Sequence, residues 1–316
     1  MQPSIRVKRI LVIRGGAIGD FILTLPALKA LREAYDQAHI EILGYPHIAA
    51  LADNRFYANA VRSIEYGALS RFFARGAELP DQLAEYFAGF DLIVSYLYDP
   101  DLIFQTNLER AGARDIIKGP AKLTEQAHAA RQLAEPMVAD LELALPSTSA
   151  AVHPSAQDRE FAENFLRNLA PPIVAIHPGS GSGRKNWPLS NWLELGNRLL
   201  SSTDFAGSIL IITGEADELQ ASRLQSAWHN PRVRFAHHLP LTHLAAVLEP
   251  TVFVGHDSGI SHLAAAAGAT CVLLFGPTNP EVWAPHGPRV KVLQAPGGDL
   301  SQLSLEAVLG AVSGMW

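Results

Sequence analysis

One pattern occurs twice in this sequence, and it constrains the fold more than any other feature. A short apolar run at residues 9–14 leads into a glycine-rich loop at 15–20 and a helical pattern at 21–35. The same succession returns at residues 173–177, 178–186 and 190–200. A strand, a loop and a helix that lead to a further strand form a βαβ unit, whose strands are parallel. The repeated pattern predicts an α/β protein with two doubly wound, Rossmann-like parallel sheets.

The length of the chain also favours two domains, because 316 residues exceed what one hydrophobic core usually organises. A helix predicted at residues 158–169 ends at Pro171 and Pro172, and prolines stop a helix and stiffen a connection. We therefore predict an N-terminal domain at residues 1–155, a linker region at 156–172 and a C-terminal domain at 173–316.

Composition excludes several classes of protein. Hydrophobic residues make up 48% and charged residues 18%, which is typical of a globular protein. The formal net charge of -6 provides no basic field for nucleic acid, so we expect no nucleic-acid partner. No segment approaches the roughly 20 apolar residues of a membrane span, and the first apolar run is too short for a secretory signal. We place the protein in the cytoplasm and leave open a peripheral contact with the membrane.

A segment near the C-terminal end indicates a site for a phosphorylated ligand. An apolar strand at residues 252–255 precedes Asp257, Ser258 and Gly259, which start a helix of small residues, and His262 follows one turn later. Strand carboxyl ends and helix N-termini hold anions, because unpaired N–H groups and the helix dipole face the ligand there. Considered alone, Asp257 is equally well explained as the cap of the following helix, and His262 as a histidine of the hydrophobic core. Together the four residues favour an anion site.

The loop at residues 178–188 is a second candidate. Three glycines within five positions let the backbone approach a ligand closely, and Arg184 and Lys185 add positive charge. A flexible surface loop is the alternative, but the position after a strand favours phosphate binding. The loop is not a Walker loop, because it lacks the GKS or GKT ending.

The glycine turn at residues 15–20 favours a dinucleotide only weakly. Arg14 occupies the first glycine position of the GxGxxG pattern, although Glu41 is expected at the end of the second strand, where an acid would bind ribose. A nicotinamide-dependent oxidoreductase is therefore an alternative function. Asp20 is either the cap of the following helix or a general base that points into a cleft.

An acidic loop follows the strand predicted at residues 208–213. Its acids Glu215, Asp217 and Glu218 suit a ribose hydroxyl or a base edge, but they also suit the charged first turn of a helix. We expect no metal site, because the histidines lack acidic partners at the spacing of metal ligands.

Taken together, the three glycine-containing segments resemble glycosyltransferase family 9, the ADP-heptose:lipopolysaccharide heptosyltransferases. The similar segments are ILVIRGGAIGDFILTLPALKALR from Ile10, IHPGSGSGRKNWPLSNWLELGNRL from Ile176 and HDSGISHLAAAAGATCVLLFGPTNP from His256. The resemblance implies the GT-B fold, in which two Rossmann-like domains face a cleft and bind acceptor and nucleotide sugar respectively. It also implies inverting transfer of a heptose from ADP-L-glycero-D-manno-heptose to the inner core of lipopolysaccharide, without a cofactor or catalytic metal.

The resemblance also implies roles for single residues. Asp20 matches the general base of the family. Lys185 matches its pyrophosphate-binding lysine, Asp257, Ser258, Gly259 and His262 match its nucleotide-diphosphate loop, and the acidic loop corresponds to its ribose-binding region without singling out one acid. Combined with the residue patterns described above, the expected contacts are Ser180, Lys185, Ser258, Gly259 and His262 to the donor diphosphate, Gly214, Glu215 and Asp257 to the donor nucleoside, and Gly16, Gly19, Arg55 and Arg62 to the acceptor.

Two questions stay open at this point. Arg55 and Arg62 either bind phosphates of a lipid-linked or core oligosaccharide acceptor or belong to a solvated basic face. Another nucleotide sugar or glycan acceptor within the family, and a non-catalytic nucleotide-sugar-binding protein, are the alternative functions.

Overall fold

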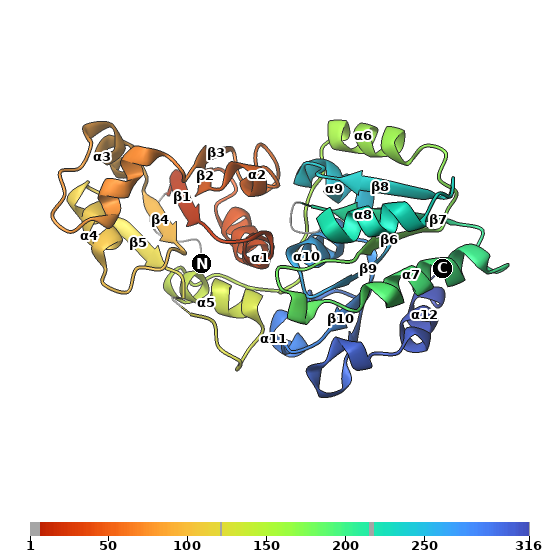
Figure 1. Cartoon of the computed structure of the whole chain (residues 1–316). Coiled ribbons are helices and arrows are strands. Elements are labelled where there is room, and N and C mark those ends of the chain that lie inside the picture. Colours follow the sequence, from red (N-terminus) through yellow and green to blue (C-terminus); the bar gives the residue numbers. More distant parts are fainter. Residues whose placement is uncertain (1–6, 121, 215–217, 316) are drawn as a thin grey trace. The chain divides into compact units, whose positions relative to one another are not determined.

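The computed structural model describes residues 7–120, 122–214 and 218–315 of the chain. The chain divides into two compact units, Met1–Thr148 and Ser149–Trp316, and each unit contains one parallel sheet (Figure 1). Helix α6 (Ala156–Leu166), which lies within the predicted linker region, belongs to the second unit. The predicted domain limits themselves stay a prediction.

The first unit has a five-stranded sheet in the order β3-β2-β1-β4-β5, and every neighbouring pair is parallel. Its strands are β1 (Arg9–Arg14), β2 (His39–Gly44), β3 (Ala60–Ser63), β4 (Leu92–Ser95) and β5 (Asp115–Lys118). Its helices are α1 (Ile18–Ala34), α2 (Pro46–Ala49), η1 (Gly67–Phe73), α3 (Asp81–Ala88), α4 (Ile103–Arg110) and α5 (Ala129–Asp140).

The sheet of the first unit is covered on both faces. Leu11 and Ile13 of β1 join a buried aromatic cluster with side chains from η1, α3 and α4. Ile10 and Val12 alternate with them along the strand and are also fully buried. Burial on both faces is the reason that the strands read as continuous apolar runs.

The second unit has a six-stranded parallel sheet in the order β11-β10-β9-β6-β7-β8. Its strands are β6 (Ile173–His177), β7 (Ser208–Thr213), β8 (Val233–His237), β9 (Val252–His256), β10 (Thr270–Phe275) and β11 (Val290–Gln294). After α6, its helices are η2 (Gly183–Lys185), α7 (Leu189–Ser201), α8 (Glu218–Ala227), α9 (Leu241–Leu248), α10 (Gly259–Ala267), α11 (Pro280–Trp283), η4 (Pro296–Gly298), η5 (Leu300–Gln302) and α12 (Leu305–Ser313).

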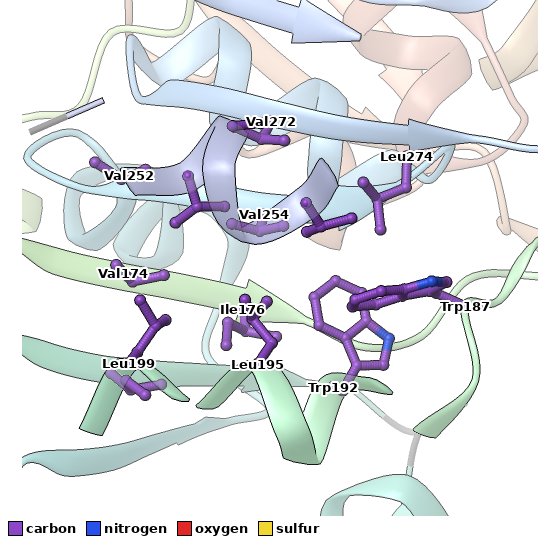
Figure 2. Close-up of a cluster of buried hydrophobic side chains, with 14 of the residues drawn as sticks. Val174, Ile176, Trp187, Trp192, Leu195, Leu199, Val252, Val254, Val272 and Leu274 are labelled. Atoms are coloured by element: carbon purple, nitrogen blue, oxygen red, sulfur yellow. The ribbon is translucent and has the colours of Figure 1, made fainter. Parts of the chain in front are cut away.

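One face of this second sheet packs against α7, α8 and α12. Figure 2 shows Trp192 and Leu195 of α7 facing Ile176 of β6, within a cluster that includes Val254 of β9. Gly255, the next residue of β9, lies toward the other face, where a Cβ atom would come within 3.1 Å of Ser261 Oγ in α10. Helices α7 and α10 therefore leave the carboxyl edge of the sheet on opposite faces.

The structure confirms two doubly wound parallel sheets. It also contains elements that the sequence pattern did not predict, namely α2, α4, β11 and α12. Strand β11 is an edge strand of partly exposed residues, so its apolar signal is weak. Helix α5 begins at Ala129, after a turn in which the side chain of Gln132 accepts from the backbone N–H of Thr124. None of the described helices combines the length and apolar character that crossing a membrane requires.

Candidate functional site

The strand order of the second unit reverses between β6 and β9, which are hydrogen-bonded neighbours. Loops that follow strands at such a reversal leave toward opposite faces of the sheet, and ligands of open α/β sheets bind beside them. The loop after β6 carries Ser180 and Lys185, and the turn after β9 carries Asp257 and Ser258. The two segments that the sequence analysis identified separately as candidate phosphate sites therefore lie at the same carboxyl edge of one sheet.

A direct contact joins these two loops. The ammonium nitrogen Nζ of Lys185 donates to Oδ2 of Asp257 at 2.6 Å, and the hydroxyl of Thr278 donates to the same oxygen at 2.8 Å. The side chain of Asp257 is 10% exposed and that of Lys185 is 31% exposed, so the carboxylate is the more buried partner of the pair. Thr278 follows β10, which means that three adjacent strand ends contribute to one polar cluster.

Helix α10 begins at this cluster. Ser258 is its N-cap, and the Ser258 hydroxyl accepts from the N–H of Ser261 at 3.3 Å. Gly259 is the first helical residue and has no side chain to cover the N–H groups of that turn. The N–H groups of a first helical turn have no partner within the helix and carry the positive end of the dipole. His262 lies in the same turn and is buried.

The loop after β6 is held by its own polar groups. The Ser180 side chain accepts from the N–H of Ser182 at 3.3 Å and lies 2.7 Å from Oδ1 of Asn186. Trp187 and Trp192 are buried at its end and pack against each other. Ser180 and Lys185 are therefore presented by a loop with fixed ends.

The predicted nucleoside contacts fall partly outside the described residues. Gly214 directly follows β7, at the same carboxyl edge of the sheet. Glu215 and Asp217 lie outside the described residues, while Glu218 begins α8. Their roles stay predictions.

In the first unit, Asp20 is the third residue of α1, and the structure confirms that it caps the helix. Its Oδ2 accepts from the N–H of Ala17 at 2.9 Å, and Oδ1 lies 3.7 Å from Nη2 of Arg14. The side chain is 42% exposed, so the carboxylate is also accessible to a ligand. Gly16 has a φ of +94°, and a Cβ there would lie 2.7 Å from the Asp20 carboxylate. Gly19 precedes Asp20 within the helix.

The structure contradicts the expected position of Glu41. The residue lies in the middle of β2 rather than at its end, and its buried carboxylate accepts from the Tyr86 hydroxyl at 2.7 Å. Arg62 donates to the same carboxylate at 3.2 Å and lies over the Tyr86 ring, while Arg55 donates to the carbonyl of Asp53. Glu41 therefore cannot serve as the ribose acid of a nicotinamide site, which removes that support for an oxidoreductase.

Sequence reasoning missed two residues of the second unit. Thr278 donates to Asp257 but was not among the predicted site residues, and His256 lies within β9, one residue beyond the strand predicted at 252–255. The available signal for both was a polar residue near the carboxyl end of a buried strand. Within residues 7–120, 122–214 and 218–315, no group of three or more His, Cys, Asp or Glu side chains is arranged to hold a metal ion.

Comparisons of the sequence with known proteins point to one family of glycosyltransferases. The profile of glycosyltransferase family 9 (heptosyltransferase) matches residues 115–310. Lipopolysaccharide heptosyltransferase 1 of Escherichia coli O18:K1:H7 is 30% identical over 192 residues, which cover 59% of this chain and 55% of the relative. The enzyme of the same name from Pseudomonas aeruginosa is 26% identical over 302 residues, which cover 88% of this chain and 81% of the relative. The alignment with the Escherichia coli relative thus spans little more than half of that protein's length.

Solved structures share the fold. A glycosyltransferase of family 9 from Veillonella parvula superposes with a TM-score of 0.78 at 19% identity and covers 98% of this chain and 97% of that one. The E. coli heptosyltransferase WaaC with ADP-2-deoxy-2-fluoro heptose gives a TM-score of 0.72 at 22% identity, with 97% of this chain and 99% of that chain covered. Because both sequence identities are below 25%, the structural likeness confirms the GT-B fold but not the activity. The family profile spans more than half of the sequence, and this chain belongs to glycosyltransferase family 9, the heptosyltransferase family.

Proposed function

We propose that this protein is an inverting glycosyltransferase that moves a heptose from ADP-L-glycero-D-manno-heptose to the inner core of lipopolysaccharide. The observation that carries the proposal is the polar cluster of Lys185, Asp257 and Thr278 beside the N-terminus of α10. A cation and a helix N-terminus at the carboxyl ends of adjacent parallel strands suit a nucleoside diphosphate. The printed names of the relatives, and the solved complexes of WaaC with ADP and with a fluorinated ADP-heptose, support the choice of donor.

In this proposal the second unit binds the donor. The diphosphate is bound by Ser180, Lys185, Ser258, Gly259 and His262, and the nucleoside by Gly214, Glu215 and Asp257. When the bond from the anomeric carbon to the phosphate oxygen breaks, negative charge develops on ADP. The Lys185 ammonium and the α10 N-terminus stabilise that charge, so the proposal assigns no step to a metal ion.

The first unit supplies the base. A hydroxyl of the acceptor attacks the anomeric carbon opposite to ADP, and the configuration inverts. Asp20 accepts the hydroxyl proton, and it does so late, because an ionised carboxylate is a weak base for an alcohol until the forming C–O bond acidifies it. The half-exposed carboxylate at the start of α1 supports this assignment.

The acceptor is a lipid-linked or core oligosaccharide, bound by Gly16, Gly19, Arg55 and Arg62, and the protein acts at the cytoplasmic face of the inner membrane. The Arg62 guanidinium already forms an ion pair with Glu41. To bind the acceptor, it would have to contact Glu41 and the acceptor at the same time. Arg62 is therefore the weakest of the proposed acceptor contacts.

The function is tested by incubating the protein with ADP-heptose, UDP-sugars and GDP-sugars in turn, and by measuring nucleotide release with and without truncated lipopolysaccharide. We expect acceptor-dependent release of ADP from ADP-heptose. Release from a UDP- or GDP-sugar alone would assign another donor. Binding of ADP-heptose without release under any condition would show a non-catalytic binding protein.

A further inference from the structure

The imidazole of His256 spans the loop that carries Ser180 and Lys185. His256 ends β9 and has no exposed surface. Its Nε2 lies 2.7 Å from the backbone nitrogen of Trp187, and its Nδ1 lies 3.3 Å from the carbonyl oxygen of Gly179. One side chain thus contacts both ends of this loop.

These two contacts determine the tautomer. The backbone N–H of Trp187 can only donate, so Nε2 of His256 must carry a lone pair and accept. The carbonyl of Gly179 can only accept, so Nδ1 must carry the proton and donate. Burial lowers the pKa of His256 to about 3, which keeps the ring neutral at physiological pH. A protonated ring would place a second hydrogen against the Trp187 N–H.

The contacts lie directly beside the proposed donor residues. Gly179 precedes Ser180, and Trp187 follows Lys185 by two positions. On the other side, His256 precedes Asp257, which accepts from Lys185, and the carbonyl of His256 accepts from the Ser261 hydroxyl of α10. The residue therefore connects the loop after β6, the turn after β9 and the first turn of α10.

The ring is also fixed from the side. It meets the indole of Trp192 edge-on, with a centroid distance of 5.3 Å and an interplanar angle of 77°. Trp187 in turn packs against Trp192, and its indole N–H donates to the carbonyl of Leu303 at 2.9 Å. The imidazole has little freedom to rotate away from the loop, because its neighbours are large buried rings.

We propose that His256 is a positioning residue of the donor site, which holds Ser180 and Lys185 against the N-terminus of α10 through its neutral Nδ1–H imidazole. The effect of His256 on donor binding rests on the function proposed above. Its tautomer and its two hydrogen bonds to the loop do not depend on that function. The inference goes beyond the predicted diphosphate contacts, because His256 itself touches no ligand in it.

The tautomer is tested first, on the full-length protein labelled with ¹⁵N. Two-bond ¹⁵N–¹H correlation spectra of the His256 ring distinguish a protonated from an unprotonated nitrogen. We expect a protonated Nδ1 and an unprotonated Nε2, with no change between pH 8 and pH 5. A proton on Nε2, or titration of the ring within that range, would overturn the proposal.

Substitutions at His256 test whether its two hydrogen bonds keep the loop in place. His256→Phe keeps a ring against Trp192 but removes both hydrogen bonds, whereas His256→Gln places an amide oxygen where Nε2 accepts from Trp187. We expect amide hydrogen exchange at residues 180–187 to accelerate at least tenfold in the Phe variant, with partial recovery in the Gln variant. Thr251→Val serves as the control, because it removes one buried hydrogen bond at the other end of β9. Equal acceleration in the control and the Phe variant would contradict a specific role of His256.

The consequence for the site is measured as ADP affinity and donor kinetics. We expect His256→Phe to raise the donor KM and the ADP dissociation constant about tenfold and to leave kcat within about threefold, while Thr251→Val changes neither. A fall in kcat with unchanged KM would contradict the positioning role. If the wild-type protein binds no ADP, the proposed function fails, and the ring spectra and the exchange measurement still decide the role of His256.

Discussion

The ammonium nitrogen of Lys185 lies 2.6 Å from a carboxylate oxygen of Asp257, although 72 positions separate the two residues in the chain. The pair joins the loop after β6 to the turn after β9, on either side of the reversal in strand order. Partial burial of both side chains reduces screening by solvent and salt, so the pair should contribute more than an ion pair at the surface.

This coupling can be measured by a double-mutant cycle with Lys185→Met and Asp257→Asn. We expect a coupling of about 1 kcal/mol in the free energy of unfolding by urea. The exposed pair of Arg198 and Glu306, at 3.4 Å, is the matched control, and its coupling should be smaller. Equal couplings for the two pairs would contradict a special contribution of the Lys185 contact.

Lys185→Met should also weaken nucleotide binding. A charge-assisted hydrogen bond to phosphate contributes about 1.5–3 kcal/mol, which corresponds to a loss of roughly tenfold or more in ADP affinity. Arg184→Met removes the neighbouring charge, which is exposed, and should have a smaller effect. Isothermal titration calorimetry with ADP checks both values. The assignment of Lys185 fails if the Arg184 variant loses more affinity.

Gly16→Ala should disturb the turn that places Asp20. The φ of +94° disfavours any residue with a side chain, and the added methyl would lie 2.7 Å from the Asp20 carboxylate. We expect a loss of about 1 kcal/mol or more in the free energy of unfolding, together with a lower kcat. Gly67→Ala is the control, because its Cβ would meet open space in the same unit. Equal stability of the two variants would show that the turn tolerates a side chain.

The fold was predictable from the sequence because buried parallel strands and glycine-rich loops leave strong local signals. Asp257 was recognised because it follows an apolar strand, and Lys185 because it adds positive charge to the glycine-rich loop after another strand. Their direct contact was not predicted, because it depends on β6 and β9 being neighbours, and strand order is a tertiary property. The bridging role of His256 was missed for the same reason.

Glu41 shows how an expected position at the end of a strand can suggest a wrong role for an acidic residue. The pattern placed it at the end of the second strand, but β2 continues to Gly44, and the acid pairs instead with Tyr86 and Arg62. These partners come from α3 and β3, so no local pattern around Glu41 indicated them. Placing Glu41 at the end of the strand instead of in its middle was enough to suggest a ribose contact that the structure contradicts.

The stability of the protein should depend on pH through His256. Burial lowers the pKa of this residue from 6.5 to about 3 in the folded chain, so the unfolded chain binds the proton more readily. The stabilising effect of the neutral ring is complete above about pH 6.5 and is lost as the pH falls toward 3. Between pH 7 and pH 5, the free energy of unfolding of the wild type should fall by about 2 kcal/mol more than that of His256→Phe. Urea denaturation at both pH values measures this difference, and parallel pH curves would contradict it.

Asp20 has two roles to separate, the helix cap that the structure shows and the general base that we propose. Asp20→Asn keeps a side-chain oxygen that can accept from the N–H of Ala17 but removes the basic carboxylate. We expect this variant to unfold at nearly the wild-type urea concentration, while kcat for heptose transfer falls by about 10²–10⁴-fold. ADP affinity should stay unchanged, since the proposed nucleotide contacts all lie in the second unit.

Asp20→Ala completes the test, because it removes the cap and the base together. It should lose about 1 kcal/mol of stability relative to Asp20→Asn and show the same loss of kcat. If the Asn variant keeps wild-type kcat while the Ala variant loses it, Asp20 acts through the helix cap alone. In that case the base must be another group, because an amide cannot take up the proton of the acceptor hydroxyl.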